Sequence, residues 1–420
     1  MKKTKSVLLS IILAIALAFM VGCTSSAYDI AVKNGYMGTE EQWLASLNGA
    51  DGTDGSDLTI NSIYAEAVEN GYEGDFFDFL DEYLTLEHSP DRSNIINKCM
   101  RSAMLVQCQF TKRSHGLTQG EEFGQQGSGV IYSINKEQGS AYIITNYHVV
   151  YSSNSDTQTH VSDEISVTPY GGSAISVSYI GGSAQYDIAV LKAQNDYFSS
   201  ALPIAANLSD SDVIVGQASI AIGNPAGNGL SATQGIISVD SETIVMEGIE
   251  DSSSYVSMRV MRIDAAVNSG NSGGGLFNAA GELIGIVNAK SSDTSIENMA
   301  YAIPSSIASA VADNIIKNNG NFNKGTVGIT ITTTNSKGYL DENGHIRIAE
   351  TVIISQVSGA ASGLLQATDV VKAITVYGET ITVTRMFHLT DPILRTLPGD
   401  SVTITVERNG QTLDITVVCG

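Results

Sequence analysis

The chain has few positively charged residues. Its 420 residues include 22 lysines and arginines against 44 aspartates and glutamates, which gives a formal net charge of −22. A protein that binds nucleic acid needs a basic face to neutralise phosphates. The sequence therefore argues against nucleic acid as a partner, although its charge says nothing about the fold. The apolar content of 43% is ordinary for a folded protein, and the length allows two globular domains and an extension.

Cysteine is also scarce, and so are patterns that bind metals or nucleotides. After Cys23 the chain has only Cys99, Cys108 and Cys419, and an odd number cannot pair completely. Cys99 and Cys108 are near enough in sequence for a disulfide, but buried thiols are equally compatible with their apolar stretch. No Cys/His spacing suggests a metal site, and no Gly-x-x-x-x-Gly-Lys-Ser/Thr loop is present. We therefore expect no metal, no cofactor and an activity that does not use ATP.

Residues 1–22 have the features of a signal peptide. Three lysines precede an apolar run over 7–21, and Gly22 and Cys23 follow directly. A cysteine after a small residue resembles the processing site of bacterial lipoproteins, which implies that the Cys23 thiol is lipidated and becomes the first mature residue. An uncleaved membrane anchor and an ordinary secretory signal are the alternatives. Each of these interpretations predicts a protein that works outside the cytoplasm.

Residues 23–89 contain an internal repeat. Its two copies are Tyr28-x-x-Ala31-Val32-x-Asn34-Gly35 and Tyr64-x-x-Ala67-Val68-x-Asn70-Gly71. The Tyr, Ala and Val spacing predicts a short helix, which Asn-Gly then ends. The copies resemble short modules near the start of Gram-positive surface proteins, so either a wall contact or an inert stalk is expected. The aspartates at 51–57 are three residues apart, which favours a flexible linker over a calcium loop with alternating ligands.

From about residue 90 onward, short β-rich runs alternate with turns. The runs include Gly129-Val130-Ile131-Tyr132, Ala141-Tyr142-Ile143-Ile144, Ile165-Ser166-Val167 and Ser219-Ile220-Ala221-Ile222. This alternation is typical of antiparallel β-barrels. Apolar positions from Ile303 to Ile316 predict one closing helix, and a polar hinge at 318–321 follows. We therefore expect one domain over 90–323 and a second β-rich domain over 324–420.

Three short motifs carry the residue types of a serine peptidase. Ser272 lies within Gly270-Asn271-Ser272-Gly273-Gly274, where small residues let the backbone turn sharply and aim N–H groups at one point. His148 follows an apolar strand, and Asp187 begins another. The order His148, Asp187, Ser272 is that of chymotrypsin and differs from that of α/β-hydrolases and subtilisins. We interpret these residues as a catalytic triad in which His148 takes the Ser272 proton and Asp187 fixes the histidine tautomer.

Residues 127–310 resemble the HtrA/Deg family of trypsin-fold serine peptidases. The matching segments are Gly127-Ser128-Gly129-Val130, Thr145-Asn146-Tyr147-His148-Val149-Val150, Asp187-Ile188-Ala189-Val190-Leu191, Ala221-Ile222-Gly223-Asn224-Pro225, Gln234-Gly235-Ile236-Ile237-Ser238, Asp264-Ala265-Ala266-Val267-Asn268 and Gly281-Glu282-Leu283-Ile284-Gly285-Ile286. The resemblance implies a mainly β fold: two six-stranded antiparallel β-barrels, then a PDZ-like α+β domain, behind a short helical N-terminal repeat region.

The resemblance also implies details of the site and of assembly. Backbone N–H groups of Gly270, Asn271 and Ser272 are expected to form the oxyanion hole. Gly275 replaces the usual proline or alanine, which would loosen the turn without touching the triad. The loop over 111–126 is modest in length, which favours a homotrimer over the large cages that relatives build with long loops.

In trypsin-fold enzymes, the residue six before the nucleophile lies at the base of the primary specificity pocket. Here it is Ala266, and the resemblance implies that Val267 and Ile286 form an apolar wall. A charged substrate side chain would lose its hydration there without gaining a partner. We therefore expect cleavage of unfolded chains after Val, Ala, Ile or Leu.

The carboxy-terminal region resembles a PDZ domain. Residues 400–410 match the family's closing hairpin, and Thr326-Val327-Gly328-Ile329 falls where the carboxylate-binding loop should be. Such a domain adds a peptide as an extra strand and holds its terminal carboxylate with backbone N–H groups. Thr326 replaces the usual aromatic residue, and Leu364 and Thr368 occupy positions that are commonly glycine. A domain that serves assembly alone is the alternative.

These expectations combine into one interpretation and one rival. The first is a lipid-anchored, ATP-independent serine endopeptidase of the cell envelope that cleaves misfolded or specific envelope proteins, with C-terminal peptides bound by the PDZ-like domain. The rival is a holdase or sensory peptide-binding module whose peptidase is latent, because an oxyanion loop can be collapsed in the resting state.

Overall fold

This computed structural model describes residues 60–72, 92–112, 121–288 and 300–420, with the single residues 32, 37 and 39. The chain forms two compact units, Met1–Pro90 and Asp91–Gly420. In the first unit, helix α4 (Ile60–Glu69) covers the second repeat copy and is followed by Gly71 with φ +97°. The predicted helix with an Asn-Gly end is therefore present in that copy. The signal segment, Cys23, the first copy and the aspartates at 51–57 lie outside the described residues. None of the helices in the described ranges is long and apolar enough to span a bilayer.

The first barrel follows helix α6 (Ser93–Met100). It closes in the order β1-β2-β3-β6-β5-β4, and its core is made of alternating apolar side chains such as Met104, Ile131 and Leu191, all fully buried. Its strands are β1 (Ala103–Lys112), β2 (Glu121–Asn135), β3 (Ser140–Thr145), β4 (Glu164–Pro169), β5 (Ile175–Ser183) and β6 (Ile188–Gln194). Cys99 and Cys108 are both free, buried thiols, and burial raises the pKa of Cys108 to about 12.

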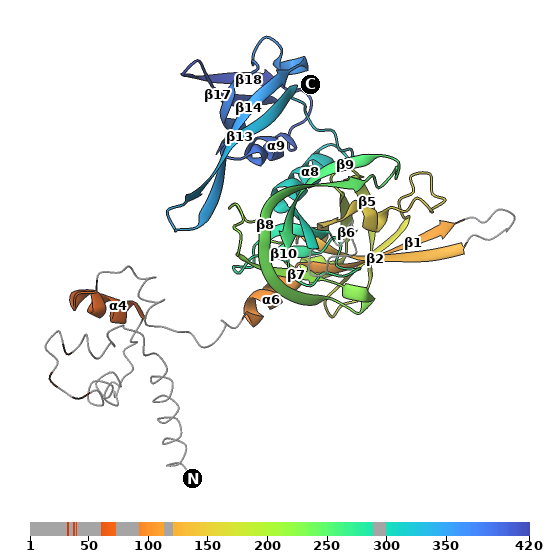
Figure 1. Cartoon of the computed structure of the whole chain (residues 1–420). Helices are drawn as coiled ribbons and strands as arrows, with labels where there is room; N and C mark the ends of the chain where they lie inside the picture. The colour runs from red at the N-terminus through yellow and green to blue at the C-terminus, as the bar shows by residue number, and fades with distance from the viewer. Residues whose placement is uncertain are drawn as a thin grey trace. The chain divides into compact units, whose positions relative to one another are not determined.

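The second barrel closes in the order β10-β11-β12-β9-β8-β7. Its longest strand, β8, curves around the barrel and pairs with β7 on one side and β9 on the other (Figure 1). Its strands are β7 (Ala218–Gly223), β8 (Ser231–Glu247), β9 (Tyr255–Ile263), β10 (Gly275–Phe277), β11 (Leu283–Asn288) and β12 (Ala300–Pro304). The segment that carries the predicted nucleophile connects β9 to β10.

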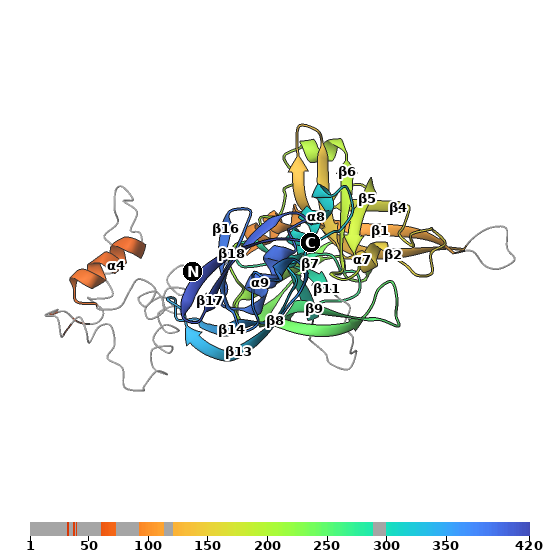
Figure 2. The same cartoon turned by 90° about the horizontal axis from the view of Figure 1, so that it is seen from above.

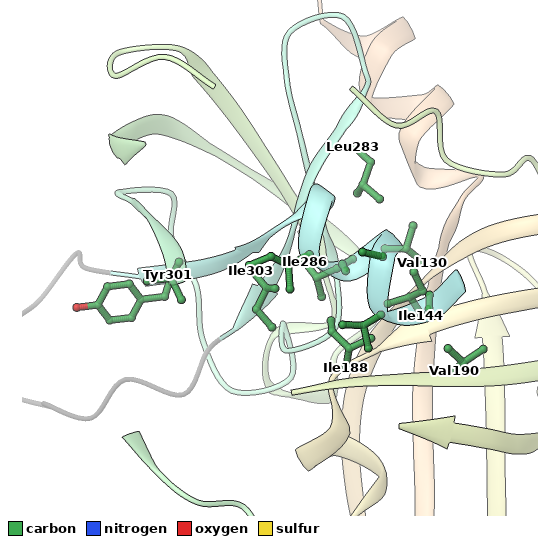
Figure 3. Close-up of a cluster of buried hydrophobic side chains, with 14 of the residues drawn as sticks. Val130, Ile144, Ile188, Val190, Leu283, Ile286, Tyr301 and Ile303 are labelled. Carbon is green, nitrogen blue, oxygen red and sulfur yellow. The ribbon is translucent and has the colours of Figure 1, made fainter. Parts of the chain in front are cut away.

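A buried apolar layer joins the two barrels. Figure 3 shows Val130, Ile144 and Ile188 of the first barrel together with Ile286 and Ile303 of the second, and each is at most 1% exposed. Full burial of one such side chain stabilises the fold by about 1.5–3 kcal/mol. Helix α8 (Ser305–Lys317) leaves the second barrel and packs against strands of both, with β5 and β6 on one side and β11 and β12 on the other. The layer and the helix thus fix the strand ends of one barrel against the loops of the other.

The carboxy-terminal part is a six-stranded sheet with one helix. Its strands run in the order β13-β14-β15-β17-β18, with β16 paired to β15, and helix α9 packs beside β13, β15 and β16 (Figure 2). The elements are β13 (Ile329–Leu340), β14 (Ile346–Val357), β15 (Val370–Val376), β16 (Glu379–Thr382), α9 (Met386–Ile393), β17 (Ser401–Arg408) and β18 (Gln411–Val418). The predicted fold class, two barrels followed by a PDZ-like α+β domain, is confirmed.

Candidate active site

His148 lies on a single helical turn, α7 (Tyr147–Val150), that begins just after β3 ends. Tyr147 and Val149, the residues on either side of it, are buried, whereas the His148 side chain is 21% exposed. Because its neighbours are anchored in the core, the ring is held in place while part of it remains open to solvent. A strand that stops at the barrel end therefore delivers the histidine to the interface between the barrels.

Asp187 makes two contacts with His148. Its Oδ2 lies 2.7 Å from His148 Nδ1, and its Oδ1 accepts from the His148 backbone N–H at 2.9 Å. The carboxylate is almost fully buried, and Asn146 Nδ2 donates to the Asp187 carbonyl at 2.8 Å. Asp187 also has φ +50°, a left-handed conformation that residues other than glycine adopt at some cost. These contacts leave His148 Nε2 as the nitrogen that faces away from the carboxylate.

The turn around Ser272 depends on glycines at two positions. Gly270 has φ +100° and Gly273 has φ +85°. A Cβ on Gly270 would lie 2.1 Å from the Asn224 carbonyl oxygen, and one on Gly273 would lie 2.2 Å from the Ser128 carbonyl oxygen. Both the left-handed conformation and the close approach exclude a side chain there. The Gly-rich pattern therefore reflects a tightly folded turn, in which Ser272 is only 6% exposed.

Backbone contacts bring this turn against the histidine and the aspartate. The position that a Gly127 Cβ would take is 2.6 Å from Val149 and 3.0 Å from the Ser272 carbonyl oxygen, so the residue after His148 and the nucleophile are close neighbours. Gly273 N–H donates to the Val287 carbonyl at 2.9 Å, and the next residue, Asn288, donates from Nδ2 to Asp187 Oδ2 at 3.0 Å. The structure thus brings together all three predicted triad residues.

Two peptide groups of the turn are oriented by hydrogen bonds to their carbonyls. Ser269 C=O accepts from Ala226 N–H at 2.8 Å, and Asn271 C=O accepts from Gly274 N–H at 2.9 Å. In a trans peptide the C=O and N–H point in opposite directions, so these bonds also set the directions of the Gly270 and Ser272 N–H groups. Asn271 N–H, the third predicted donor, instead donates to the Asn268 carbonyl at 3.0 Å. It is already paired inside the turn.

The predicted pocket residues differ in their surroundings. Ala266 is exposed and Val267 is half-buried, whereas Ile286 is fully buried in the layer between the barrels. Gly275 begins β10, and a Cβ there would lie 2.5 Å from the Phe277 ring. The Phe277 ring therefore occupies the space that a side chain at position 275 would take.

The PDZ-like domain has its own glycine turn beside a cavity. Gly328 has φ +81°, and a Cβ there would lie 2.1 Å from the Ser358 carbonyl oxygen. Thr326 exchanges two backbone hydrogen bonds with Gly420, of 3.0 and 2.9 Å, and its hydroxyl also donates to the Gly420 carbonyl. A cavity of about 440 Å³ adjoins the turn, and its lining includes Val327, Gly328, Ile329, Ile331, Leu389 and Ile393.

Ser128 and Asn288 are contacts of the site that the motif analysis did not assign. Both are buried, and each bonds a residue far away in sequence: Ser128 bonds Gly270, and Asn288 bonds Asp187. Ser128 stands within Gly127-Ser128-Gly129-Val130, which carried the family resemblance without a chemical role. Nothing in the spacing of these residues indicated their partners.

Comparison with known proteins places the chain in a family. The model of the trypsin-like peptidase domain matches residues 127–286, a range that contains His148, Asp187 and Ser272. The chain is 31% identical over 312 residues to the serine protease Do-like HtrA of Lactococcus lactis strain IL1403, which covers 71% of each protein.

Other relatives match over less of their own length. The chain is 34% identical to the probable periplasmic serine endoprotease DegP-like of Brucella suis, over 70% of this chain and 52% of that protein, so it spans about half the length of such relatives. A solved structure titled HtrA-type protease AlgW with tripeptide superposes with a TM-score of 0.50 and 27% identity, over 79% of this chain and 97% of that one. On the combined match of sequence and fold, the chain belongs to the HtrA family of serine proteases.

Proposed function

We propose that the chain is an ATP-independent serine endopeptidase of the cell envelope, acting through Ser272, His148 and Asp187. The observation that carries this proposal is the 2.7 Å contact between His148 Nδ1 and Asp187, next to a nucleophile turn whose peptide groups are individually held. The periplasmic assignment of the Brucella relative and the signal-like segment at 1–22 support a location outside the cytoplasm. Residues 90–323 form the peptidase domain, and residues 324–420 form the PDZ-like domain.

In the proposed peptide hydrolysis, each of the three side chains has one role. Because Asp187 holds His148 Nδ1–H, the neutral ring has its acceptor at Nε2, which takes the Ser272 proton as Oγ bonds to the substrate carbonyl carbon. The imidazolium formed is stabilised by the buried Asp187 carboxylate. His148 then passes this proton to the departing amine as the C–N bond breaks, leaving an acyl-enzyme. Water, deprotonated by the same nitrogen, releases the acid and restores Ser272.

The oxyanion that forms at the carbonyl needs donors fixed in advance. We assign this role to the N–H groups of Gly270 and Ser272, because the carbonyls of the preceding residues are tied down by Ala226 and Gly274. Removing one such donor typically reduces turnover by about 10²–10³-fold. Asn271 N–H, committed to Asn268, contributes to the shape of the turn.

The substrates proposed are misfolded or specific envelope proteins. Ala266 and Val267 offer no charge to a substrate side chain, and Ile286 is a fully buried apolar residue, so cleavage is expected after Val, Ala, Ile or Leu. The cavity beside the Gly328 turn is the proposed site for C-terminal peptides, with Val327 and Gly328 N–H groups near the carboxylate. It is lined by residues of β13 and α9 and also by Tyr186, Arg259 and Ile307 of the peptidase domain. A lipid on Cys23 would tether the protein to the membrane, and a homotrimer is the expected assembly.

The experiment that tests this proposal compares purified wild-type protein with Ser272→Ala. Wild type should cleave unfolded casein and react with a fluorophosphonate, and Ser272→Ala should do neither while keeping its melting temperature. Ser176→Ala, an exposed serine on β5, is the matched control and should behave as wild type. Casein cleavage by Ser272→Ala at a tenth of the wild-type rate would contradict the assignment. Mass spectrometry of the products should show a majority of cuts after aliphatic residues.

A further inference from the structure

The geometry points to Ser128 as a positioning residue of the reaction: its hydroxyl holds the peptide group between Gly270 and Asn271, so that the two oxyanion donors stay aimed at one point. This inference rests on the proposed function, because it concerns the hole assigned to Gly270 and Ser272. Ser128 itself has no contact with the reacting atoms. It acts through the backbone of the turn.

Ser128 contacts the nucleophile turn at two carbonyls. It lies on β2 of the first barrel, is 0% exposed, and donates its backbone N–H to the Ser272 carbonyl at 2.8 Å. Its Oγ lies 2.7 Å from the Gly270 carbonyl oxygen and 2.9 Å from the Asn224 backbone nitrogen. Because the Asn224 N–H can act only as a donor, Oγ accepts from it and sends its own proton to Gly270. One hydroxyl thus links a strand of the first barrel, the end of β7 and the nucleophile turn.

The place of this bond within the turn determines its effect. The Ser269 and Asn271 carbonyls orient the two oxyanion donors. The Ser269 carbonyl is held by Ala226 of the second barrel, and the Asn271 carbonyl is held by Gly274 at the end of the turn. The peptide group between them carries the Gly270 carbonyl, and on its other side the Asn271 N–H bonds Asn268 within the turn itself. Within the described ranges, Ser128 is therefore the contact outside the turn that holds this middle peptide group.

Gly270 is a residue at which the turn can change shape. Glycine adopts conformations closed to other residues, and Gly270 already has φ +100°. Without the Ser128 hydroxyl, the Gly270 carbonyl and the Asn224 N–H would both lose a buried partner, and burial makes such a loss costly. Rotation of the middle peptide group would then satisfy the carbonyl elsewhere. It would change ψ of Gly270 and φ of Asn271, so that the Gly270 and Ser272 N–H groups on either side no longer converge on one point.

A role in packing alone makes a different prediction. If the hydroxyl only stabilised the contact between the barrels, its removal would lower the melting temperature and leave the chemistry of the folded enzyme unchanged. The chain offers a matched control in Ser219 on β7, which is also 0% exposed and whose hydroxyl has no hydrogen-bond partner among the described residues. Ser219→Ala removes the same atom from the same kind of environment without touching the turn.

The test measures inactivation by a fluorophosphonate, whose phosphoryl oxygen enters the oxyanion hole as Ser272 attacks. The concentration dependence separates the binding constant KI from the maximal rate kinact, and casein cleavage is followed in parallel. Full-length wild type, Ser128→Ala, Ser128→Cys, Ser219→Ala and Ser272→Ala are compared at one temperature below all melting transitions. Ser128→Cys keeps a weak donor and acceptor at nearly the same place.

We expect kinact and casein turnover of Ser128→Ala to fall by about 10–100-fold, with KI within twofold of the wild-type value. Ser128→Cys should recover part of the loss, and Ser219→Ala should match wild type. A folded Ser128→Ala enzyme with kinact within twofold of wild type overturns the inference, as does an equal loss in Ser219→Ala. If Ser128→Ala does not fold, kinact of Ser128→Cys is compared with wild type instead. A reduced kinact supports the inference, and a kinact within twofold of wild type overturns it. Inactive wild type, or active Ser272→Ala, would instead refute the proposed function.

Discussion

Two turns of the molecule share one backbone feature. They are the nucleophile turn over 268–274 and the PDZ-like turn over 326–329. Each places a left-handed glycine where a Cβ would lie 2.1 Å from a carbonyl oxygen, Asn224 for Gly270 and Ser358 for Gly328. Each is proposed to bind a negatively charged oxygen with backbone N–H groups. The transition state supplies that oxygen in one turn, and a peptide carboxylate supplies it in the other.

The two turns differ in how they are held. The nucleophile turn is bonded by Ser128 of one barrel and by Ala226 and Val287 of the other. The PDZ-like turn is bonded by Ser358 N–H, at 2.7 Å from the Gly328 carbonyl, and by the chain end at Gly420. Stabilising a transition state requires donors that need no reorganisation, whereas a peptide site gains its affinity over a whole added strand. The turn proposed to stabilise a transition state is thus the one held by more elements of the fold.

The largest effect is expected from Gly270→Ala. The added Cβ meets the Asn224 carbonyl and forces the backbone out of its left-handed conformation, so casein turnover should fall by at least about 100-fold. Gly171→Ala is the control, since Gly171 has φ +69° but nothing within 4 Å of its Cβ position. Similar losses in the two variants would show that left-handed φ alone, and not the fixed turn, governs the rate.

A smaller effect, on binding alone, is expected from Gly328→Ala. Fluorescence anisotropy with a labelled decapeptide ending in an aliphatic residue should show affinity weakened by about 10-fold or more, and amidation of the wild-type ligand should do the same. Casein turnover and the residues after which casein is cut should not change. Gly344→Ala, with φ +76° and open space, should bind as wild type. An unchanged affinity of Gly328→Ala would end the analogy between the turns.

The smallest effect is expected at Thr368. Here a residue other than glycine has a left-handed conformation, so the substitution introduces a glycine instead of removing one. This β-branched residue has φ +80°, in the same PDZ-like domain, at a position where the resemblance expects glycine. Thr368→Gly should relieve the strain and raise the free energy of unfolding by about 1 kcal/mol, after the greater flexibility of glycine in the unfolded chain is allowed for. Calorimetry of the full chain should show the melting transition of this domain move up by a few degrees. A lower transition would mean that Thr368 is not strained.

The sequence predicted the parts of the molecule that depend on local pattern. Strand alternation gave the barrels, and the order and setting of His148, Asp187 and Ser272 identified the residues that the structure brings together. Partners between barrels left no such pattern, because Ser128 meets Gly270 and Asn288 meets Asp187 only after both barrels close. Likewise, that Asn271 N–H is bound inside the turn could be learned only from the path of the backbone. Glycine patterns predict sharp turns, but they do not predict which N–H groups point outward.

Helix α8 has a consequence for the time at which the protein becomes competent during synthesis. In the sequence, β12 is the last strand of the second barrel, and α8 follows it and packs against β5 and β6 of the first barrel. Helix α8 follows His148, Asp187 and Ser272 in the sequence. Each of these residues is therefore synthesised before the helix that packs against both barrels. Contacts between distant segments form late in folding, and domains of a nascent chain fold in the order of their emergence. The proposed active site, which is divided between two barrels, is therefore assembled only after Ser272, the last of its three residues, has been synthesised.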